Sequence, residues 1–183
     1  MPLTLSRSIL VILVPGIVAI APWCLLAIMR IPAATDIYQT YQTAVNAVLF
    51  ALAVVFGSCL ESIGSRREVR WDQQQEQRYN VREAWFTYLA ESSPVEPVGN
   101  RYIARTVTTM YFELAMSLAA PIMFLGIATN FLLEQSPSGW ILGTSLSVAV
   151  AISGYYFHRS ARDTHRVLCE ARLELMVRRL RGH

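Results

Sequence analysis

The sequence lacks lysine, and its charged residues are confined to a few segments. Its 183 residues include 16 arginines and 13 acidic residues, so that 16% are charged, where a soluble domain has about 25%. Hydrophobic residues make up 54% of the chain, and the arginines lie in polar segments separated by long uncharged runs. This composition excludes an ordinary soluble domain. Too little chain remains outside the apolar runs for a separate globular core, so residues 1–183 are expected to form a single membrane domain.

Cysteine and histidine are also scarce. Cys24, Cys59 and Cys169 are widely spaced, and two of them lie in apolar runs, which excludes a disulfide framework and a zinc pattern. The apolar runs contain no histidine that could ligate haem, and no HExxH motif occurs. His158 and His165 share a helical stretch with Cys169, but no further ligand or base is spaced to join them. We interpret all three as solvated surface residues, and we predict no catalytic residue, no metal site and no cofactor.

Four apolar runs are long enough to cross a bilayer. A helix rises about 1.5 Å per residue, and the hydrocarbon layer is about 30 Å thick. The first run is too long for the core of a secretory signal peptide, which has about 7–15 residues. The sequence therefore predicts an all-α, polytopic membrane protein with four transmembrane helices, at about 9–29, 44–60, 114–133 and 140–157.

The distribution of arginine predicts the orientation. Arg7 precedes the first span, seven arginines lie between the second and third spans, and seven follow the fourth. Arg30 alone falls on the other side. By the positive-inside rule, both termini and the central segment are expected in the cytoplasm, with the chain in the cell's inner (plasma) membrane.

The polar segments are expected to be helical extensions of the spans. After the fourth span, apolar residues recur at steps of three and four, as on one face of an amphipathic helix. No proline or glycine interrupts this stretch between Gly154 and Gly182, so the fourth span should continue as one helix through 158–181. The apolar positions are Ala161, Thr164, Leu168, Ala171 and Leu175.

The central segment 61–113 is predicted to be a cytoplasmic helical region. Residues 65–78 contain no glycine and no proline, and should continue the second span as a polar helix. Asn80 followed by Glu83 has the spacing of a capping box, which predicts a new helix. That helix, over 81–91, is expected to fold back or lie along the bilayer surface. Asn100 can cap a further helix that leads into the third span.

Small residues at four-residue spacing mark close helix packing in membranes. Gly143, Ser147 and Ala151 have this spacing in the fourth span. They are expected to pack within a four-helix bundle, and the alternative is an interface between subunits of a homo-oligomer or a stripe that lines a pore.

Polar side chains in the spans are candidates for a pore or gate. An ionisable residue at the end of a span could form a selectivity ring in an oligomer. The alternatives are that the acids pair with Arg66, Arg67 or Arg159, and that the uncharged residues hydrogen-bond to a neighbouring helix. The candidates are Glu61, Glu113, Asn130, Ser117, Ser145 and Ser153.

Two further sets of residues could bind partners from the cytoplasm. An apolar stripe on the cytoplasmic helices could contact a soluble protein, through Trp85, Leu168 and Leu175. The C-terminal segment carries seven arginines and three acids, whereas the central segment carries seven arginines and eight acids. Only the C-terminal helix is therefore distinctly basic. It could bind an anionic lipid or a nucleotide-type ligand through Arg178, Arg179 and Arg181, or simply be a solvated face.

These observations favour an oligomeric channel or pore-type effector that is controlled from the cytoplasmic side. In architecture alone, the chain resembles the small multi-span membrane effectors of bacterial anti-phage systems. A membrane scaffold that anchors a soluble partner is the alternative. A transporter or membrane enzyme is least favoured. The first span has no acid, unlike that of small four-span drug exporters, and the outer segments lack the cysteine pairs of quinone-coupled disulfide enzymes.

Overall fold

The computed structural model describes residues 9–79, 97–133 and 136–181, and these ranges are almost entirely helical. A short π-helix begins the described chain and continues into the first long helix. The elements are η1 (Ile9–Leu13), α2 (Val14–Arg30), α3 (Pro32–Thr40), α4 (Gln42–Tyr79), α6 (Pro97–Leu133) and α7 (Pro137–Arg181).

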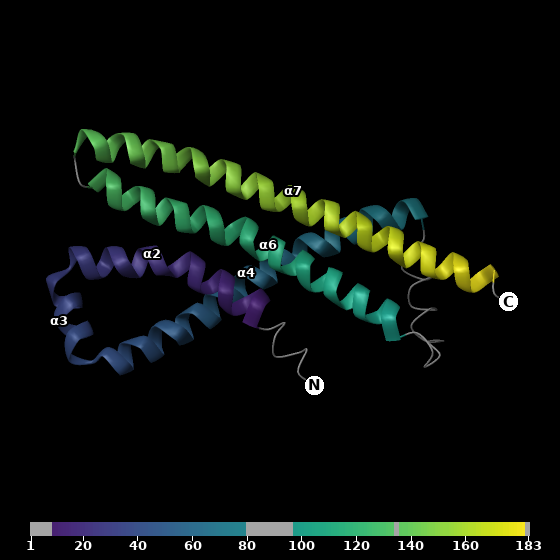
Figure 1. Cartoon of the computed structure of the whole chain (residues 1–183), viewed down its shortest axis with the longest axis horizontal. Helices are drawn as coiled ribbons and strands as arrows, with labels where there is room; N and C mark the ends of the chain where they lie inside the picture. Colours follow the sequence, from purple (N-terminus) through teal and green to yellow (C-terminus); the bar gives the residue numbers. More distant parts are fainter. Residues whose placement is uncertain (1–8, 80–96, 134–135, 182–183) are drawn as a thin grey trace.

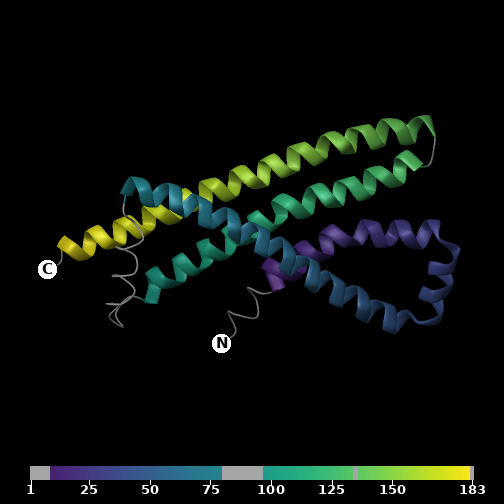
Figure 2. The ribbon, with the colours of Figure 1, turned by 180° about the vertical axis from the view of Figure 1, so that it is seen from behind.

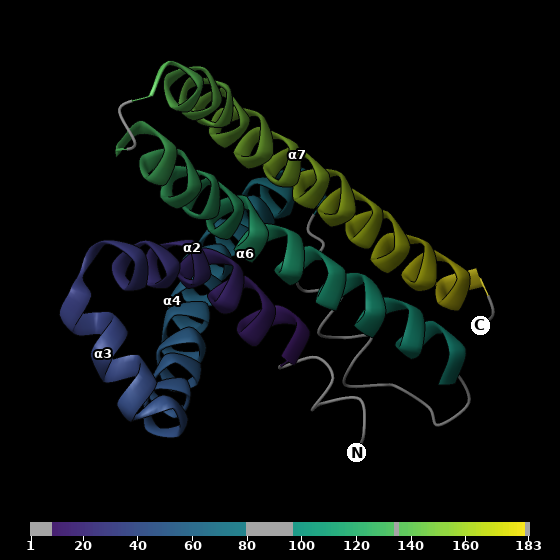
Figure 3. The ribbon, with the colours of Figure 1, turned by 60° about the vertical axis from the view of Figure 1, so that its left-hand side comes forward.

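The helices are arranged around α6. Helices α6 and α7 form a long antiparallel pair, and α2 packs along α6, while α4 crosses α2 and α6 (Figures 1 and 3). Helix α3, the end of α6 and the start of α7 lie at one end of the molecule. The polar halves of α4, α6 and α7 extend together at the opposite end, the polar end (Figure 2).

Four helices are long and apolar enough to cross a membrane, as the sequence predicts. The stretches are Ile9–Arg30, Gln42–Gln74, Tyr102–Leu133 and Pro137–Glu174, each of which contains one predicted span. The predicted all-helical class is therefore confirmed. Because consecutive spans alternate in direction, their polar extensions lie at the same end.

The predicted continuity of spans and extensions is also confirmed. Helix α4 runs without a break for 38 residues, and α7 for 45 residues. Helix α6 begins at Pro97, earlier than the predicted cap at Asn100, because proline is well suited to the first turn of a helix. The predicted capping box at Asn80 and the helix over 81–91 lie outside the described residues.

The segment between the first two spans is a helix, which the sequence analysis did not predict. Ile31 has an extended backbone that separates α2 from α3, and Pro32 starts the new helix. The Thr35 hydroxyl donates a hydrogen bond to the carbonyl oxygen of Ile28 at 2.7 Å. Helix α3 thereby connects the diverging ends of α2 and α4 (Figure 3).

Two apolar clusters hold the helices together, and both include α6. The cluster nearer the polar end joins α6 to α7, and the other joins α6 to α2 and α4. The members of the first are Ile103, Met110, Leu114, Ala161 and Leu168, and those of the second are Ala19, Leu60, Ala115 and Ala119.

Helix α4 contacts the other helices along only part of its length. Ala53, Gly57 and Leu60 are buried where α4 crosses α2 and η1. Between this crossing and α3, large apolar side chains of α4 are exposed, including Val48 and Phe50. Helix α4 is therefore held at this crossing and in its polar half, whereas the stretch of its apolar half next to α3 has exposed side chains.

Candidate functional site

Polar side chains of α4 and α7 meet at the polar end, beyond the apolar stretches that end at Leu60 and Phe157. Residues three and four apart share one face of a helix, so α4 presents its contributing side chains together. The same spacing brings the α7 residues onto one face. We call this group the α4–α7 junction: Glu68, Trp71 and Asp72 from α4, with His165, Cys169 and Arg172 from α7.

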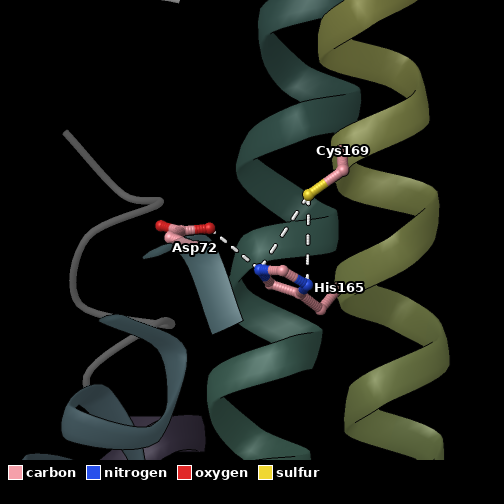
Figure 4. A group of neighbouring side chains, drawn as sticks. All are labelled: Asp72, His165 and Cys169. Atoms are coloured by element: carbon pink, nitrogen blue, oxygen red, sulfur yellow. Dashed lines mark hydrogen bonds and ion pairs between the residues drawn. The ribbon is translucent and has the colours of Figure 1, made fainter. Parts of the chain in front are cut away.

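The Asp72 carboxylate and the His165 ring form the closest polar contact of the junction. His165 Nε2 lies 2.9 Å from Asp72 Oδ1 (Figure 4). The His165 side chain is 3% exposed and that of Asp72 is 45% exposed. Burial alone would lower the pKa of His165, but the hydrogen bond to Asp72 and the contact with Cys169 raise that pKa to about 9. The ring is therefore protonated at neutral pH and donates a charge-assisted hydrogen bond.

Cys169 lies one turn beyond His165 on α7, with its thiol toward the ring (Figure 4). Its Sγ atom is 3.9 Å from both Nδ1 and Nε2. A thiol that a histidine base activates instead approaches one ring nitrogen along its lone pair. This arrangement brings sulfur, nitrogen and oxygen donors together without aligning a nucleophile with a base.

The burial of His165 and Cys169 corrects the sequence analysis, which interpreted them as solvated. Both are buried, with exposed fractions of 2% and 6%, because their face of α7 packs against α6 and α4. His158 is half-buried, and its ring packs edge-on against Trp71 at 5.5 Å. The missing partner was Asp72, which lies 93 positions from His165 in the sequence. Because Asp72 and His165 lie on different helices, the spacing of residues within one helix does not reveal that they are neighbours.

The remaining groups of the junction balance its charge. Trp71 packs edge-on against His165, with the ring centroids 5.5 Å apart. Arg172 Nη1 lies 3.9 Å from Asp72 Oδ1. Glu68 is buried, and this burial raises its pKa, while a hydrogen bond from Tyr111 of α6 acts in the opposite direction. Two acids and two cationic side chains are therefore gathered between the helices.

Glu113, a predicted gate residue, connects α6 to α7. Ser160 donates a hydrogen bond to one carboxylate oxygen at 2.6 Å, and Thr164 donates to the other at 2.7 Å. Ser160 and Thr164 are one turn apart on α7, so both hydroxyls face the same carboxylate. The described partners of Glu113 are these hydroxyls and not the arginines that the sequence analysis offered as the alternative.

Ser117 is buried in the interior and does not line a surface. Its hydroxyl donates to the carbonyl oxygen of Leu114 at 2.7 Å and accepts from Arg67 Nη1 at 3.3 Å. This contact places a cation of α4 against α6. It agrees with the reading in which a polar residue of a span bonds to a neighbouring helix.

The other pore candidates are distributed over several surfaces. Ser145 and Ser153 donate to carbonyl oxygens of their own helix, at 2.7 and 3.1 Å. The backbone oxygen of Asn130 accepts a hydrogen bond from Arg30 at 3.3 Å. Glu61 is half-buried on α4 near the crossing with η1. The structure therefore does not bring the six candidates into one place within a single chain.

The small residues of the fourth span divide into two groups. Gly143 is buried, and a Cβ atom there would meet the Leu132 side chain of α6. Ser147 and Ala151 are exposed. Packing within the chain therefore accounts for Gly143, and the other two remain open to a second subunit.

Leu168 was predicted to contact a soluble partner, and this prediction is corrected. The residue lies in the core with an exposed fraction of 1%. It packs with Ile103 and Met110 of α6. This removes the central residue of the predicted partner stripe. The side chains of Trp85, Leu175, Arg178, Arg179 and Arg181 lie outside the described ones.

Asp72, His165 and Cys169 are a group that could hold a metal ion. Each offers one ligand atom, and these atoms all lie within 4.8 Å of one another. Two of the three residues are buried, and the carboxylate approaches from a different helix.

Comparisons of the chain with protein-family models, with curated proteins and with solved structures found no match.

Proposed function

We propose that the chain is a subunit of a homo-oligomeric membrane pore that is controlled from its polar end. The observation that carries this proposal is the asymmetry of α4. This unbroken helix of 38 residues is held in its polar half by α6 and α7 and at its middle by α2 and η1, whereas its end next to α3 has large exposed apolar side chains.

In this proposal, α4 moves as one body, so that a displacement of its polar half also displaces its apolar half. A continuous helix transmits a rotation from one end to the other, because its packed backbone bends little. The close crossing with η1 and α2, at Gly57 and Gly16, supplies a pivot. Movement of the polar half would therefore change the position of the apolar half in the bilayer.

Two of the polar contacts that hold the polar half come from different neighbouring helices. Arg67 is bonded to Ser117 of α6, and Asp72 is bonded to His165 of α7. Of the two, the Asp72–His165 contact lies beyond the predicted spans of both of its helices. A ligand or partner that changed this contact would act on α4 without entering the membrane. This supports control from the side at which the polar halves lie, which the arginine distribution predicts to be the cytoplasm.

Exposed apolar faces of α4 and α7 are available for contact between subunits. On α7, Val148 and Ile152 are exposed at 60% and 62%, and Ser147 and Ala151 flank them. Small residues allow two helices to approach closely in lipid. We propose that these faces meet other copies of the chain, with lipid covering the remainder.

The test is ion flux from liposomes that contain the full chain. Asp72→Asn removes the charge that holds α4 to α7, so this variant should conduct more than the unsubstituted chain. Glu61→Gln, near the pivot, should alter ion selectivity or gating. Glu170→Gln is the matched control, because Glu170 is exposed on α7. Its flux should equal that of the unsubstituted chain.

Absence of flux from the unsubstituted chain and from Asp72→Asn would contradict the pore. The particle mass in detergent, from light scattering, tests the oligomer separately. A monomer at every detergent and protein concentration would contradict the proposed assembly.

A further inference from the structure

We propose that Asp72, His165 and Cys169 form a binding site for a divalent transition-metal ion of the zinc class, which would join α4 to α7. The proposal does not depend on conduction, since binding can be measured on the solubilised chain.

The donor atoms suit this class of ion. Zinc and cobalt accept imidazole nitrogen, thiolate sulfur and carboxylate oxygen, whereas magnesium and calcium prefer oxygen ligands alone. Zinc lies about 2.0–2.3 Å from such atoms. Tetrahedral geometry then separates neighbouring ligand atoms by roughly 3.3–3.6 Å. The observed separations are 2.9 Å between nitrogen and oxygen and 3.9 Å between nitrogen and sulfur, and all three atoms lie within 4.8 Å of one another. Side-chain movements of about 1 Å would therefore bring the ligands to the distances that zinc requires.

The helices hold these donors in position. His165 and Cys169 are four residues apart on α7, the spacing at which two side chains on one helix can ligate the same ion. Asp72 reaches the pair from α4. Three protein ligands leave a fourth position for water, as in an open zinc site.

The charges of the junction also agree with a dication. A metal needs a neutral imidazole and a thiolate, so binding would release the proton that His165 shares with Asp72 and the Cys169 thiol proton. The carboxylate and the thiolate then neutralise the two charges of the ion. Arg172, 3.9 Å from Asp72, remains close to this carboxylate and orients it.

Cobalt provides the first test, because a thiolate ligand gives cobalt a charge-transfer absorption that carboxylates do not produce. The full chain in detergent, first stripped with a chelator, is titrated with Co²⁺. We expect one ion per chain together with this absorption. Cys169→Ser should abolish the band, and Asp72→Asn and His165→Gln should each weaken binding by at least about 10-fold.

Cys59→Ser is the matched control, since Cys59 is exposed and lies on α4 away from the junction. It should bind Co²⁺ like the unsubstituted chain. A chain without the thiolate band, or a band that persists in Cys169→Ser, would overturn the proposal.

A second measurement does not require altered ligands. The chain has three cysteines, so substituting Cys24 and Cys59 by serine leaves Cys169 as the only thiol. Zn²⁺ should slow its reaction with a thiol reagent, and Mg²⁺ at the same concentration should not. Equal rates with and without Zn²⁺ would overturn the site and would leave the pore proposal unaffected.

Discussion

Gly16 and Gly57 face each other where α2 crosses α4, and neither position has room for a Cβ atom. A Cβ atom added to Gly16 would lie 3.1 Å from the backbone nitrogen of Gly57, and would also run into the carbonyl oxygen of Ala53. A Cβ atom on Gly57 would run into the carbonyl oxygen of Ile12 in η1. Backbone atoms cannot turn away from such a contact as a side chain can. The crossing therefore requires glycine at both positions.

We expect Gly57→Ala to destabilise the protein by about 1–3 kcal/mol, because the added methyl group must push two helix backbones apart. Gly143→Ala is the matched comparison. Its methyl group would run into Cγ and Cδ2 of the Leu132 side chain and would lie 3.3 Å from the Ala128 carbonyl oxygen. Because Leu132 can shift whereas a backbone carbonyl of a packed helix cannot, the cost should be smaller than that of Gly57→Ala. Thermal unfolding of both variants, followed by circular dichroism in one detergent, measures the difference. Equal losses would show that the crossing does not require glycine.

Glu113→Gln should destabilise the α6–α7 pair by about 1.5–3 kcal/mol, since the charged acceptor of two hydroxyl groups is lost. A double-mutant cycle with Thr164→Val isolates one of these bonds. The control is Thr144→Val, because the Thr144 hydroxyl is exposed and bonds to a carbonyl of its own helix. Additive effects of Glu113→Gln and Thr164→Val would argue against their hydrogen bond.

Glu68→Gln should stabilise the protein increasingly as the pH rises. Burial raises the pKa of Glu68 above its ordinary value of 4.5. Its contribution to stability is therefore fully present below pH 4.5 and is lost as the pH rises through the folded-state pKa. Glutamine resembles the protonated acid and avoids this loss. Denaturant unfolding at several pH values should show a difference that grows with pH and then levels off.

Glu170→Gln is the control for this pH series, because Glu170 is exposed. Its difference from the unsubstituted chain should not change with pH. A constant difference for Glu68→Gln as well would contradict the raised pKa.

Leu168→Ala should cost about 2–5 kcal/mol, as expected for a cavity in a packed core. Val167→Ala, at a neighbouring position that is 44% exposed, should cost far less. Thermal melting of the two variants distinguishes a core residue from a partner-binding one. A small effect for Leu168→Ala would restore the interpretation as a surface contact.

The helices could be predicted from the sequence because the bilayer imposes strong constraints on composition. Charge-free runs of sufficient length locate the spans, and the absence of glycine and proline after Gly154 predicts the continuous α7. Helix α3 was missed because its nine residues are too few for a clear periodicity. The sequence feature that marks the start of α3 is Pro32, because proline is common at the first position of a helix.

The junction could not be predicted, because it depends on how the helices pack. Periodicity correctly placed Leu168 on the apolar face of α7, but it does not tell whether that face meets a partner or the chain's own core. Likewise, His165 and Asp72 become neighbours only through the register of α4 against α7. The sequence feature that could have indicated the junction is the helical spacing of polar residues on two separate segments. This feature is not specific, because many surface helices show the same pattern.

The length of α7 allows the orientation of the chain in a membrane to be measured. Its 45 residues extend about 68 Å at about 1.5 Å per residue, more than twice the thickness of the hydrocarbon layer. With the predicted span 140–157 in the membrane, roughly half of the helix would project beyond one face, and this half carries the arginines from Arg159 onward. Trypsin cleaves after arginine and cannot cross a sealed vesicle. The positive-inside rule predicts that this end is cytoplasmic. Vesicles of known orientation should then lose the end of α7 only when their cytoplasmic face is outward.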